Sequence, residues 1–487
     1  MPLRTAHEYV ESLRDGRTVY FRGRQVQDVT THPVISVAVR HAAIDYQLAH
    51  DPKHRALCVV DDEEGEHSRY YQVPRTADHL LKRSALIELA TAEGATLVVL
   101  IKEIGTDALF ALLRISSAVD RAYSTDYSRR VRDFYRYCRS NDLAMAVAQT
   151  DVKGDRSLGP ASQSDPDMYV HIVERRADGI VVRGAKAHTS VSTNVNELIV
   201  LPTRALSEAD RDYAVSFAIP IDTPGLVLLA SAYDSHATQG SAVEHPISAL
   251  HKMMETTTVF NDVFVPWDRV FLAGEYDFAG PLALAFVEHH RFTAISYKLP
   301  LVDAFVGAAM LLADMNGISK AGHVRDKLTQ LISYAETLRG LTHYAAINGK
   351  VREEGIMAPD PLYVNMAKYH FAHGYHEAVR HVQDIAGGAL VTGPGAEDLE
   401  SPETANYYYK YYAGRNVDGR ERLKALALVK NLVASEFAGY QEVLAVHAEG
   451  SLEAEKQMVL RSYDGTSALE FVRRLAGFLE GRQKAGV

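Results

Sequence analysis

The spacing of apolar residues changes twice along the chain, and these changes constrain the fold more than any other feature. From about Pro33 to Leu143, apolar residues recur every three or four positions, which is the spacing of amphipathic helices. Short apolar runs of strand length follow, and from about Gly280 long helical patterns return. We therefore predict an α+β fold with three parts. They are an N-terminal helical domain (1–142), a middle antiparallel β domain (143–279) and a C-terminal helical bundle (280–487).

Local signals refine this division. Thr5-Ala6-His7-Glu8 has the spacing of a capping box and predicts a helix from about Ala6 to Asp15. Residues 18–26 resemble a hairpin with Gly23 at its turn, and residues 168–183 alternate as strand, turn and strand. Further strands are expected within 197–202, 213–219, 225–230 and 257–265, and helices within 304–316, 321–348 and 421–448.

Composition limits the class of partner. The net charge of −10 argues against a nucleic-acid partner, because phosphate backbones require a basic surface. Two distant cysteines, Cys58 and Cys138, cannot form a disulfide framework. The first residues lack the apolar core of a signal peptide, and no run of 18 apolar residues predicts a membrane span. We therefore expect a cytoplasmic protein that acts on a small-molecule substrate.

Two polar loops are candidates for binding a cofactor. Residues 149–157 lie where helix gives way to sheet, and they offer hydroxyls, free amides and a glycine. Residues 184–190, Gly-Ala-Lys-Ala-His-Thr-Ser, follow the predicted hairpin with small and polar side chains. The spacing of a Walker A loop is absent from this second segment. Taken alone, residues 149–157 are better explained as a solvated turn rich in Asp, Gly and Ser, whereas residues 184–190 are equally compatible with an ordinary β-turn.

A third candidate is Gln383-Asp-Ile-Ala-Gly-Gly388, at the end of a predicted helix. Paired glycines are typical of a helix C-cap. They would also let the backbone of a neighbouring chain approach a pyrophosphate. The sequence alone does not separate these two interpretations.

The three segments occur in an order that resembles a known family. Together with 178–188, 208–217, 275–280 and 384–388, segment 150–156 resembles 4-hydroxybutyryl-CoA dehydratase and the wider family of 4-hydroxyphenylacetate 3-monooxygenases. The resemblance implies an acyl-CoA dehydrogenase-like fold, non-covalent FAD and a homotetramer whose flavin sites use two subunits. The residues it assigns to FAD are Gln149, Thr150, Asp151, Lys153, Gly154, Asp155, Arg156, Ser157, His188, Thr189, Ser190, Gln383, Gly387 and Gly388.

The chain departs from the dehydratase where that enzyme binds a [4Fe–4S] cluster. The histidine ligand matches His290, but the three cysteine positions fall on Val99, Glu103 and Tyr297. Because none of these can replace a thiolate, we expect no iron–sulfur cluster and no other metal. The catalytic glutamate matches Glu255, the active-site tyrosine falls on Ala294, and a second glutamate maps near Glu442 or Leu444.

The substrate clamp of the hydroxylases is also missing, since its Arg, Tyr and His positions fall near Ile101, Gly105 and Val147. The remaining candidates for catalysis are His290 and Glu255 as titratable groups, with Glu103 and Tyr297 in the vacated ligand positions. The alternative is that His290 is a satisfied interior histidine and that Glu103 and Tyr297 only fill space.

Two further patterns have simpler explanations. His370, His373 and His376 recur every three residues beside Glu377, but a solvated helical face explains them better than a metal site. The tyrosine-rich run 406–412 is expected to pack between subunits.

Three functions are compatible with these residues. The first is a monooxygenase in which a separate reductase supplies FADH2 and oxygen hydroxylates an aromatic or activated carbon. The second is an FAD-dependent dehydratase, isomerase or dehydrogenase of CoA thioesters, in which His290 and Glu255 transfer protons. The third is an FAD-binding structural protein without activity.

Overall fold

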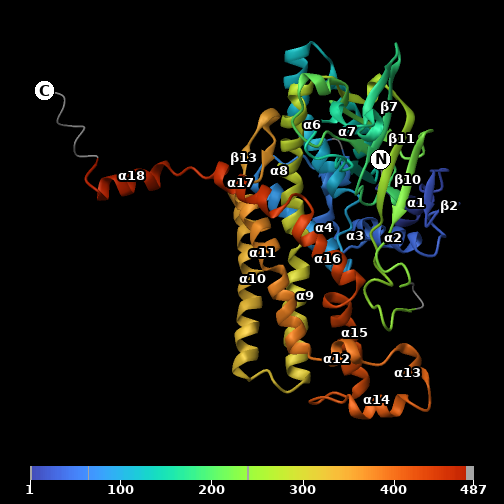
Figure 1. The fold of residues 1–487 in the computed structure, drawn as a ribbon, viewed down its shortest axis with the longest axis vertical. Helices are drawn as coiled ribbons and strands as arrows, with labels where there is room; N and C mark the ends of the chain where they lie inside the picture. Colours follow the sequence, from blue (N-terminus) through green and yellow to red (C-terminus); the bar gives the residue numbers. More distant parts are fainter. Residues whose placement is uncertain (1–2, 64, 238–240, 479–487) are drawn as a thin grey trace.

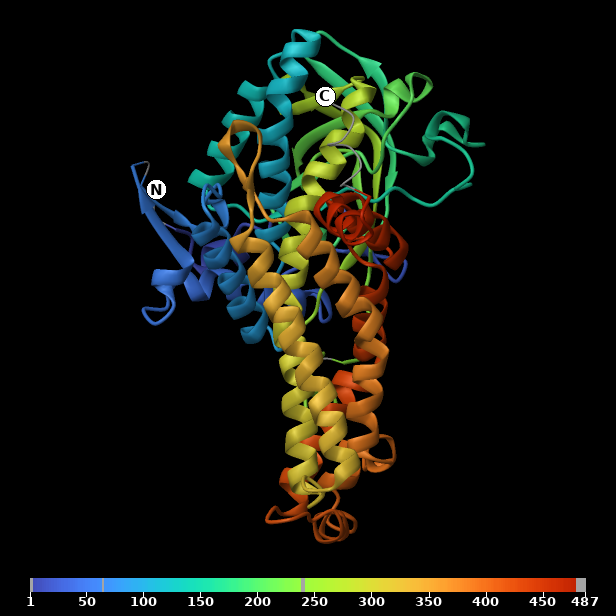
Figure 2. The same ribbon diagram turned by 90° about the vertical axis from the view of Figure 1, so that its left-hand side faces the viewer.

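Helices and two sheets follow one another in the predicted order in the computed structural model of the chain, which describes residues 3–63, 65–237 and 241–478. Figures 1 and 2 show the sheets packed beside the N-terminal helices, with long helices extending away from them as a bundle.

The N-terminal part is mainly helical. In α1 the Thr5 hydroxyl accepts from the Glu8 amide and the Glu8 carboxylate accepts from the Thr5 amide, so the predicted capping box forms. The long helix α6 is almost entirely buried along its first three turns and forms the centre of this part. The helices are α1 (Ala6–Glu11), α2 (Ile35–Ala42), α3 (Ile44–His50), α4 (Arg55–Cys58), α5 (Ala77–Glu93), α6 (Glu103–Tyr123) and α7 (Tyr127–Ser140), with a hairpin of β3 (Val59–Asp62) and β4 (Gly65–Ser68).

Two sheets form the middle of the chain. The larger has the strand order β2-β1-β10-β11-β7-β6 and the smaller β12-β9-β8-β5. Most pairings are antiparallel, as expected, but β1 pairs with β10 and β5 pairs with β8 in parallel. The strands are β1 (Val19–Phe21), β2 (Arg24–Val26), β5 (Met145–Ala148), β6 (His171–Arg175), β7 (Gly179–Lys186), β8 (Glu197–Val200), β9 (Val215–Pro220), β10 (Leu226–Ser231), β11 (Glu255–Pro266) and β12 (Val270–Ala273).

The N-terminal hairpin belongs to the larger sheet. Its turn residues Arg22 and Gly23 both have positive φ (50° and 76°), as the tight turn of a two-residue hairpin requires. Because β1 pairs with β10, about two hundred residues later in the chain, the hairpin joins the N-terminal part to the sheet. Sequence patterning predicted the hairpin, but its pairing with β10 depends on tertiary packing.

The bundle is built from α8 (Ala279–Tyr297), α9 (Leu299–Met315), α10 (Gly322–Ile347) and α11 (Pro361–Ala386), with α15 (Gly419–Val433) and α16 (Glu436–His447) against them. By length and composition the stretch Tyr276–Met315 is apolar enough to cross a membrane, but 61% of its most apolar window is buried within this protein. Such burial is what the core of a helical bundle requires.

Short elements complete the chain. Residues 350–351 and 357–358 form the small ladder β13–β14, and α12 (Ala389–Thr392), α13 (Ala396–Glu400) and α14 (Ala405–Tyr411) lie at the far end of the bundle (Figure 1). After α16 come α17 (Leu452–Ser462) and α18 (Thr466–Leu475). In α14, Tyr407 and Tyr411 are exposed, so the predicted packing of this tyrosine-rich run between subunits remains a prediction.

Gly184 in β7 has a backbone conformation and a close neighbour that allow no side chain. Its φ is +127°, and a Cβ there would lie 2.3 Å from the backbone oxygen of Tyr169. We therefore expect Gly184→Ala to lower the free energy of unfolding by about 2–4 kcal/mol, measured by chemical denaturation. The matched control is Gly340→Ala in α10, where a Cβ meets nothing within 4 Å. That variant should be neutral or more stable by about 0.5–1 kcal/mol, and equal losses in both variants would contradict the prediction.

Candidate functional site

Glu255, the first residue of β11, lies between the sheet and the bundle. The Ser190 hydroxyl lies 2.9 Å from both of its carboxylate oxygens, and the Tyr440 hydroxyl of α16 donates to Oε1 at 2.8 Å. Burial raises the pKa of Glu255 to about 7, while the hydrogen bonds from Tyr440 and Ser190 act in the opposite direction. Glu255 can therefore exchange a proton near neutral pH, as a general acid or base must.

The Tyr440 ring is held in place by a second aromatic side chain. It stacks on Tyr233, with ring centroids 4.1 Å apart and planes 25° apart. The Tyr233 hydroxyl in turn accepts a hydrogen bond from the amide of Met253 at 3.3 Å. Tyr440 belongs to the bundle and Tyr233 to the loop after β10. Their stacking therefore fixes the orientation of the Tyr440 hydroxyl that donates to Glu255.

A second carboxylate, Glu449, contacts Tyr297. The Tyr297 hydroxyl donates to one carboxylate oxygen, and the Lys298 ammonium lies 3.1 Å from the other. Burial acts to raise the pKa of Glu449, but Lys298 and Lys368 outweigh it and lower that pKa to about 2. Burial lowers the pKa of Lys298 to about 8, against the attraction of Glu449. Glu449 is therefore a fixed anion at neutral pH.

Glu255 and Glu449 thus differ in protonation although both act electrostatically on Tyr297, whose pKa is raised by burial and by these carboxylates. Carboxyl groups whose environments push their pKa values apart are typical of acid and base assignments in active sites. The sequence had suggested a second glutamate near Glu442 or Leu444. Glu442 instead pairs with His376 at 2.9 Å on the outside of the bundle, and the buried carboxylate is Glu449.

His290 is oriented by a buried carboxylate. Its Nδ1 lies 3.1 Å from Oδ2 of Asp107, whose Oδ1 accepts from Arg83 at 2.7 Å. The ring stacks on Phe286 at 4.9 Å. Because Asp107 accepts the hydrogen on Nδ1, the neutral ring carries its free electron pair on Nε2.

Glu103 lies in a separate buried acidic cluster. It accepts from the Tyr70 hydroxyl at 3.3 Å, and burial raises its pKa. Burial and the charge of Glu103 also raise the pKa of Asp45, whose carboxylate oxygens lack a hydrogen-bond partner in the described part of the chain. Arg83 bridges the backbone oxygen of Glu103 to Asp107. Of the four predicted catalytic residues, Glu255 and Tyr297 are close enough for Glu255 to raise the pKa of Tyr297, while His290 is linked to Glu103 through Asp107 and Arg83.

The first two loops predicted for the cofactor lie side by side. The amide of Ala187 donates to the oxygen of Thr150 at 2.8 Å, and the buried Lys186 ammonium binds the Gln149 oxygen (2.8 Å) and Asp151 (2.6 Å). Asp151 therefore supports the loop from within. Residues 153–157 are exposed, and Asp155 accepts from the amide and hydroxyl of Ser157.

The second loop contains an unsatisfied donor. The Thr189 hydroxyl is buried without a hydrogen-bond partner among the described residues, while His188 is exposed with φ of 54°. Lys153 and His447 both act electrostatically on His188, so the end of α16 faces these loops. Exposed amides beside an orphaned hydroxyl fit the polar edge of a flavin.

The third predicted segment lies elsewhere. Gln383 donates to the Val433 oxygen at 2.6 Å, and Gly387 and Gly388 are exposed, with open space where a Cβ would lie. The 26 residues of α11 span about 39 Å, and the helix ends at the end of the bundle far from the sheets (Figure 1). One protomer therefore does not bring these glycines to the loops at 149–157 and 188–190.

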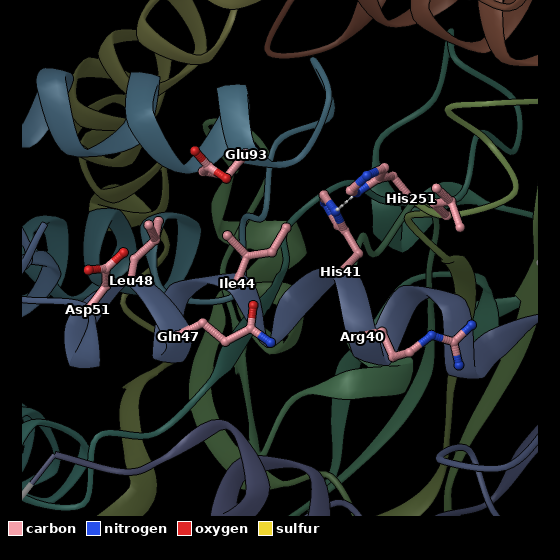
Figure 3. Close-up of a pocket in the computed structure, with 9 residues that line it drawn as sticks. Arg40, His41, Ile44, Gln47, Leu48, Asp51, Glu93 and His251 are labelled. Carbon is pink, nitrogen blue, oxygen red and sulfur yellow. Dashed lines mark hydrogen bonds between the residues drawn. The ribbon is translucent and has the colours of Figure 1, made fainter. Parts of the chain in front are cut away.

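A pocket of about 420 Å³ opens beside α2 and α3 (Figure 3). At one end His41 and His251 point toward each other, with their Nδ1 atoms 3.2 Å apart, and Nε2 of His41 lies 3.0 Å from the Val98 oxygen. Burial lowers the pKa of His41 to about 3, so its ring is neutral and donates from Nε2. The pocket is lined by Arg40, His41, Ile44, Gln47, Leu48, Asp51, Glu93, Leu250 and His251.

This pocket is separated from a smaller inner cavity by one segment of chain. Residues 96–98 line the inner cavity together with Tyr297 and Lys298, while the Val98 oxygen holds His41 on the outer side. Thr96 in this segment has φ of 78°, which is unfavourable for a β-branched residue. Such strain is typical of segments beside functional sites.

The side chains of His370, His373 and His376 contact different partners. Nε2 of His370 bonds the Tyr334 oxygen at 3.0 Å, His373 packs against Tyr369, and His376 pairs with Glu442. No group of three or more His, Cys, Asp or Glu side chains within 3–63, 65–237 and 241–478 is arranged to hold a metal ion.

Sequence reasoning missed Asp107, Lys298, Tyr440 and Glu449. Asp107 follows Glu103 by four residues, so the helical repeat of α6 could have indicated that both share a face. Lys298 directly follows Tyr297 and could have been found from it. Tyr440 and Glu449 carried no local signal, because only the packing of α16 on the sheet brings them to Glu255 and Tyr297.

Comparison with known proteins identifies relatives along the whole chain. The family models described as 4-hydroxyphenylacetate 3-hydroxylase N terminal and C terminal match residues 5–272 and 279–477. A 4-hydroxybutyryl-CoA dehydratase/vinylacetyl-CoA-Δ-isomerase from Clostridium aminobutyricum is 34% identical, with 98% of this chain and 99% of the relative covered. The oxygenase component of a 4-hydroxyphenylacetate 3-monooxygenase from Thermus thermophilus is 29% identical, with 90% of each covered.

Solved structures agree with both branches. An archaeal 4-hydroxybutyryl-CoA dehydratase from N. maritimus superimposes with a TM-score of 0.91 at 30% identity, covering 98% of this chain and 95% of that one. An oxygenase component of 4-hydroxyphenylacetate 3-monooxygenase complexed with FAD gives 0.88 at 27%, covering 99% of each chain. Butyryl-CoA dehydrogenase from Megasphaera elsdenii gives 0.50 at 14% identity, which confirms the predicted acyl-CoA dehydrogenase-like fold.

The contact between Tyr440 and Glu255 yields a titration test. Tyr440→Phe removes a hydrogen bond donated to the carboxylate, so the ionised form loses stabilisation and the pKa of Glu255 rises above about 7. We expect the loss of its proton to move up by about one pH unit. Difference infrared spectroscopy of the carboxyl band, assigned with Glu255→Gln, measures this.

Two further variants test whether the shift comes from the hydrogen bonds to Glu255. Ser190→Ala should shift the titration in the same direction, because it removes the other donor. Tyr233→Phe keeps the stacked ring and removes no hydrogen bond to Glu255, so it should leave the titration in place. An unchanged titration in Tyr440→Phe would contradict the prediction.

Proposed function

Since the chain belongs to the 4-hydroxyphenylacetate 3-hydroxylase family, we propose that it is a flavin-dependent monooxygenase. It would use reduced FAD and oxygen to hydroxylate a small aromatic or activated substrate, and a separate reductase would supply the reduced flavin. Monooxygenase names among the relatives support this class, including a 4-nitrophenol 2-monooxygenase oxygenase component from Rhodococcus and an FADH2-dependent monooxygenase from Burkholderia cepacia. The substrate clamp of the hydroxylases is absent, so the substrate need not be 4-hydroxyphenylacetate.

The observation that carries the proposal is the state of the three vacated ligand positions. Val99 is buried in the core, Glu103 accepts from Tyr70, and Tyr297 donates to Glu449. An iron–sulfur cluster requires thiolate ligands, and the side chains of Val99, Glu103 and Tyr297 do not supply them. The donor set at these three positions therefore does not fit an iron–sulfur cluster.

The same residues do fit FAD. Amides and side chains of 149–157 and 188–190 would hold it, with the orphaned Thr189 hydroxyl as one donor. When bound, FAD supplies the electrons that activate oxygen. Glu255 would take a proton from the substrate, because its pKa of about 7 allows both charge states at neutral pH. His290, held by Asp107, would present Nε2 to the substrate.

The decisive experiment mixes oxygen with the anaerobically reduced flavoprotein and a panel of phenols. Product formation should account for the oxygen consumed. We expect His290→Ala to bind flavin normally but to release most of the oxygen as hydrogen peroxide, because the substrate is no longer positioned. Phe286→Leu, which removes the stacking ring but keeps His290 and Asp107, is the milder control. Coupled turnover in His290→Ala would contradict the role given to His290. Oxygen consumption by the wild type without any oxygenated product, or about four irons per chain in anaerobically purified protein, would refute the monooxygenase assignment.

A second function is supported by the pair of carboxyls. Glu255, with a pKa of about 7, and anionic Glu449 both act electrostatically on Tyr297, and two such carboxyls would suit proton transfer between two carbons of a CoA thioester. The 34% identity to a CoA-thioester dehydratase favours the same chemistry. Incubation with crotonyl- or butyryl-CoA in deuterium oxide separates the two functions. Exchange into the acyl carbons that Glu255→Gln abolishes, without oxygenated product, would establish this second function instead.

We also propose that FAD lies across a subunit interface in a homotetramer. The support is that Gly387 and Gly388 are exposed and lie far from the loops of their own protomer. Gly388→Leu should weaken FAD binding at least tenfold while leaving the melting temperature of the flavin-free protein nearly unchanged, as measured by titration and calorimetry. Gly340→Ala, on an open helical surface, serves as the control. A monomer with full flavin occupancy would contradict the proposal.

A further inference from the structure

The pocket beside α2 and α3 takes no part in the flavin reaction proposed above (Figure 3). Residues 96–98 separate it from the inner cavity next to Tyr297. Its volume of about 420 Å³ lies within the range of small-molecule sites in proteins. We call it the outer pocket, and the chemistry of its lining side chains shows which class of ligand it fits.

Two histidines on one side of the outer pocket hold each other in fixed tautomers. A carbonyl oxygen can only accept, so Nε2 of His41, 3.0 Å from the Val98 oxygen, carries the hydrogen. Nδ1 of the neutral His41 ring is then an acceptor, and Nδ1 of His251, 3.2 Å away, donates to it. Burial lowers the pKa of His251, so its ring is neutral at neutral pH and Nε2 bears a free electron pair. Within residues 3–63, 65–237 and 241–478 this Nε2 makes no hydrogen bond, so it can accept one from a ligand.

The position of this acceptor is fixed before a ligand arrives. The His41 ring packs against the backbone of Gly94, where a Cβ would lie 2.7 Å from its Cε1 atom. The His251 ring meets it edge to face, with the ring centroids 5.4 Å apart and the planes 87° apart. A rigid acceptor loses little conformational freedom on binding, which favours affinity.

Carboxylates occupy the other side of the outer pocket. Figure 3 shows Asp51 and Glu93 to the left of the two histidines. Glu93 is exposed and makes no ion pair among the residues that the structure describes. Asp51 accepts from the Lys53 amide at 2.9 Å and lies 4.0 Å from Nε2 of His54. Two carboxylates on one side favour a cationic group that donates charge-assisted hydrogen bonds.

Apolar side chains line the space between the two polar sides. Ile44 and Leu48 are four residues apart on α3 and therefore share one face, and Leu250 is 41% exposed. On the histidine side, the guanidinium of Arg40 can donate to a ligand oxygen. A hydroxyl can accept from Arg40 and donate to His251, whereas a carboxylate has no hydrogen to donate.

We propose that the outer pocket binds a small amine that carries a hydroxyl group at its far end. The ammonium group would lie beside Asp51 and Glu93, and the hydroxyl would donate to Nε2 of His251. The apolar middle of the ligand would pack on α3. Tyramine has these three parts in this order. An anionic ligand is disfavoured, because the two carboxylates outnumber the one guanidinium.

The first test measures the affinity of the full-length flavoprotein for three matched compounds by calorimetric titration. Tyramine carries both polar ends, phenethylamine lacks the hydroxyl, and 4-ethylphenol lacks the amine. We expect tyramine to bind at one site per chain and the other two to bind about tenfold more weakly, because each leaves one side of the pocket unpaired. Equal affinity for all three compounds, or no binding of tyramine, would overturn the proposal.

A pair of variants locates the bound tyramine. Gln47→Trp places an indole over the outer pocket from an exposed position on α3 and should weaken tyramine binding about tenfold or more. Gln457→Trp makes the same substitution at an exposed position on α17 and should leave the affinity unchanged. Full affinity in Gln47→Trp would place the ligand elsewhere, the flavin site included, and would refute the outer pocket.

Two further variants assign the two ends of the ligand. His251→Phe keeps a ring beside His41 but removes Nε2, so tyramine and phenethylamine should bind it equally. Glu93→Gln should weaken the binding of both amines and leave that of 4-ethylphenol unchanged. Melting temperatures of the flavin-loaded variants show whether each is folded. A tenfold preference for tyramine that survives in His251→Phe would contradict the proposal. Neither oxygen nor reduced flavin enters these titrations, so their outcome is separate from that of the flavin reaction.

Discussion

The hydrogen bond from Tyr440 to Glu255 is the contact on which the site depends. Glu255 begins a central strand of the larger sheet, and Tyr440 belongs to a helix more than 180 residues later. The sheet carries the loops at 149–157 and 188–190, while the bundle carries His290, Tyr297 and Glu449. The contact between Glu255 and Tyr440 therefore ties the titratable groups of the bundle directly to the sheet that carries these loops. The stacked Tyr233 ring makes the contact rigid, because Tyr440 cannot turn without losing that packing.

Periodicity was enough to predict the elements, because each follows from short-range spacing. The capping box at Thr5, the hairpin around Gly23 and the strand on either side of residues 177–178 all form as expected. What spacing could not supply is the choice of partner. The parallel pairing of β1 with β10 and the position of α18 depend on surfaces far away in the chain. Patterning identifies which face of an element is apolar and leaves open what covers it.

The residues of the site also fall into those that the sequence identified and those that only tertiary packing brings together. His290, Glu255 and Tyr297 were found through a resemblance in which their positions are marked by neighbouring motifs. Glu449 escaped because it follows the end of α16, where the chain leaves the helix with φ of 57° and no repeat constrains the alignment. The segment before it points Glu442 outward to His376, so the nearest glutamate by sequence is not the buried one. Lys298, Lys368 and Tyr297 converge on Glu449 only after the bundle has packed.

The difference between the two carboxyls follows from their partners. Glu449 is buried against the ammonium groups of Lys298 and Lys368, so protonating it would leave the buried Lys298 without its counter-ion, while Lys368 would keep Glu455. Glu255 has only neutral donors, from Ser190 and Tyr440, and either charge state leaves its neighbours neutral. Changing the protonation state therefore costs less free energy at Glu255 than at Glu449. Glu255 is therefore the carboxyl whose charge can change near neutral pH, whereas Glu449 and its lysines keep theirs.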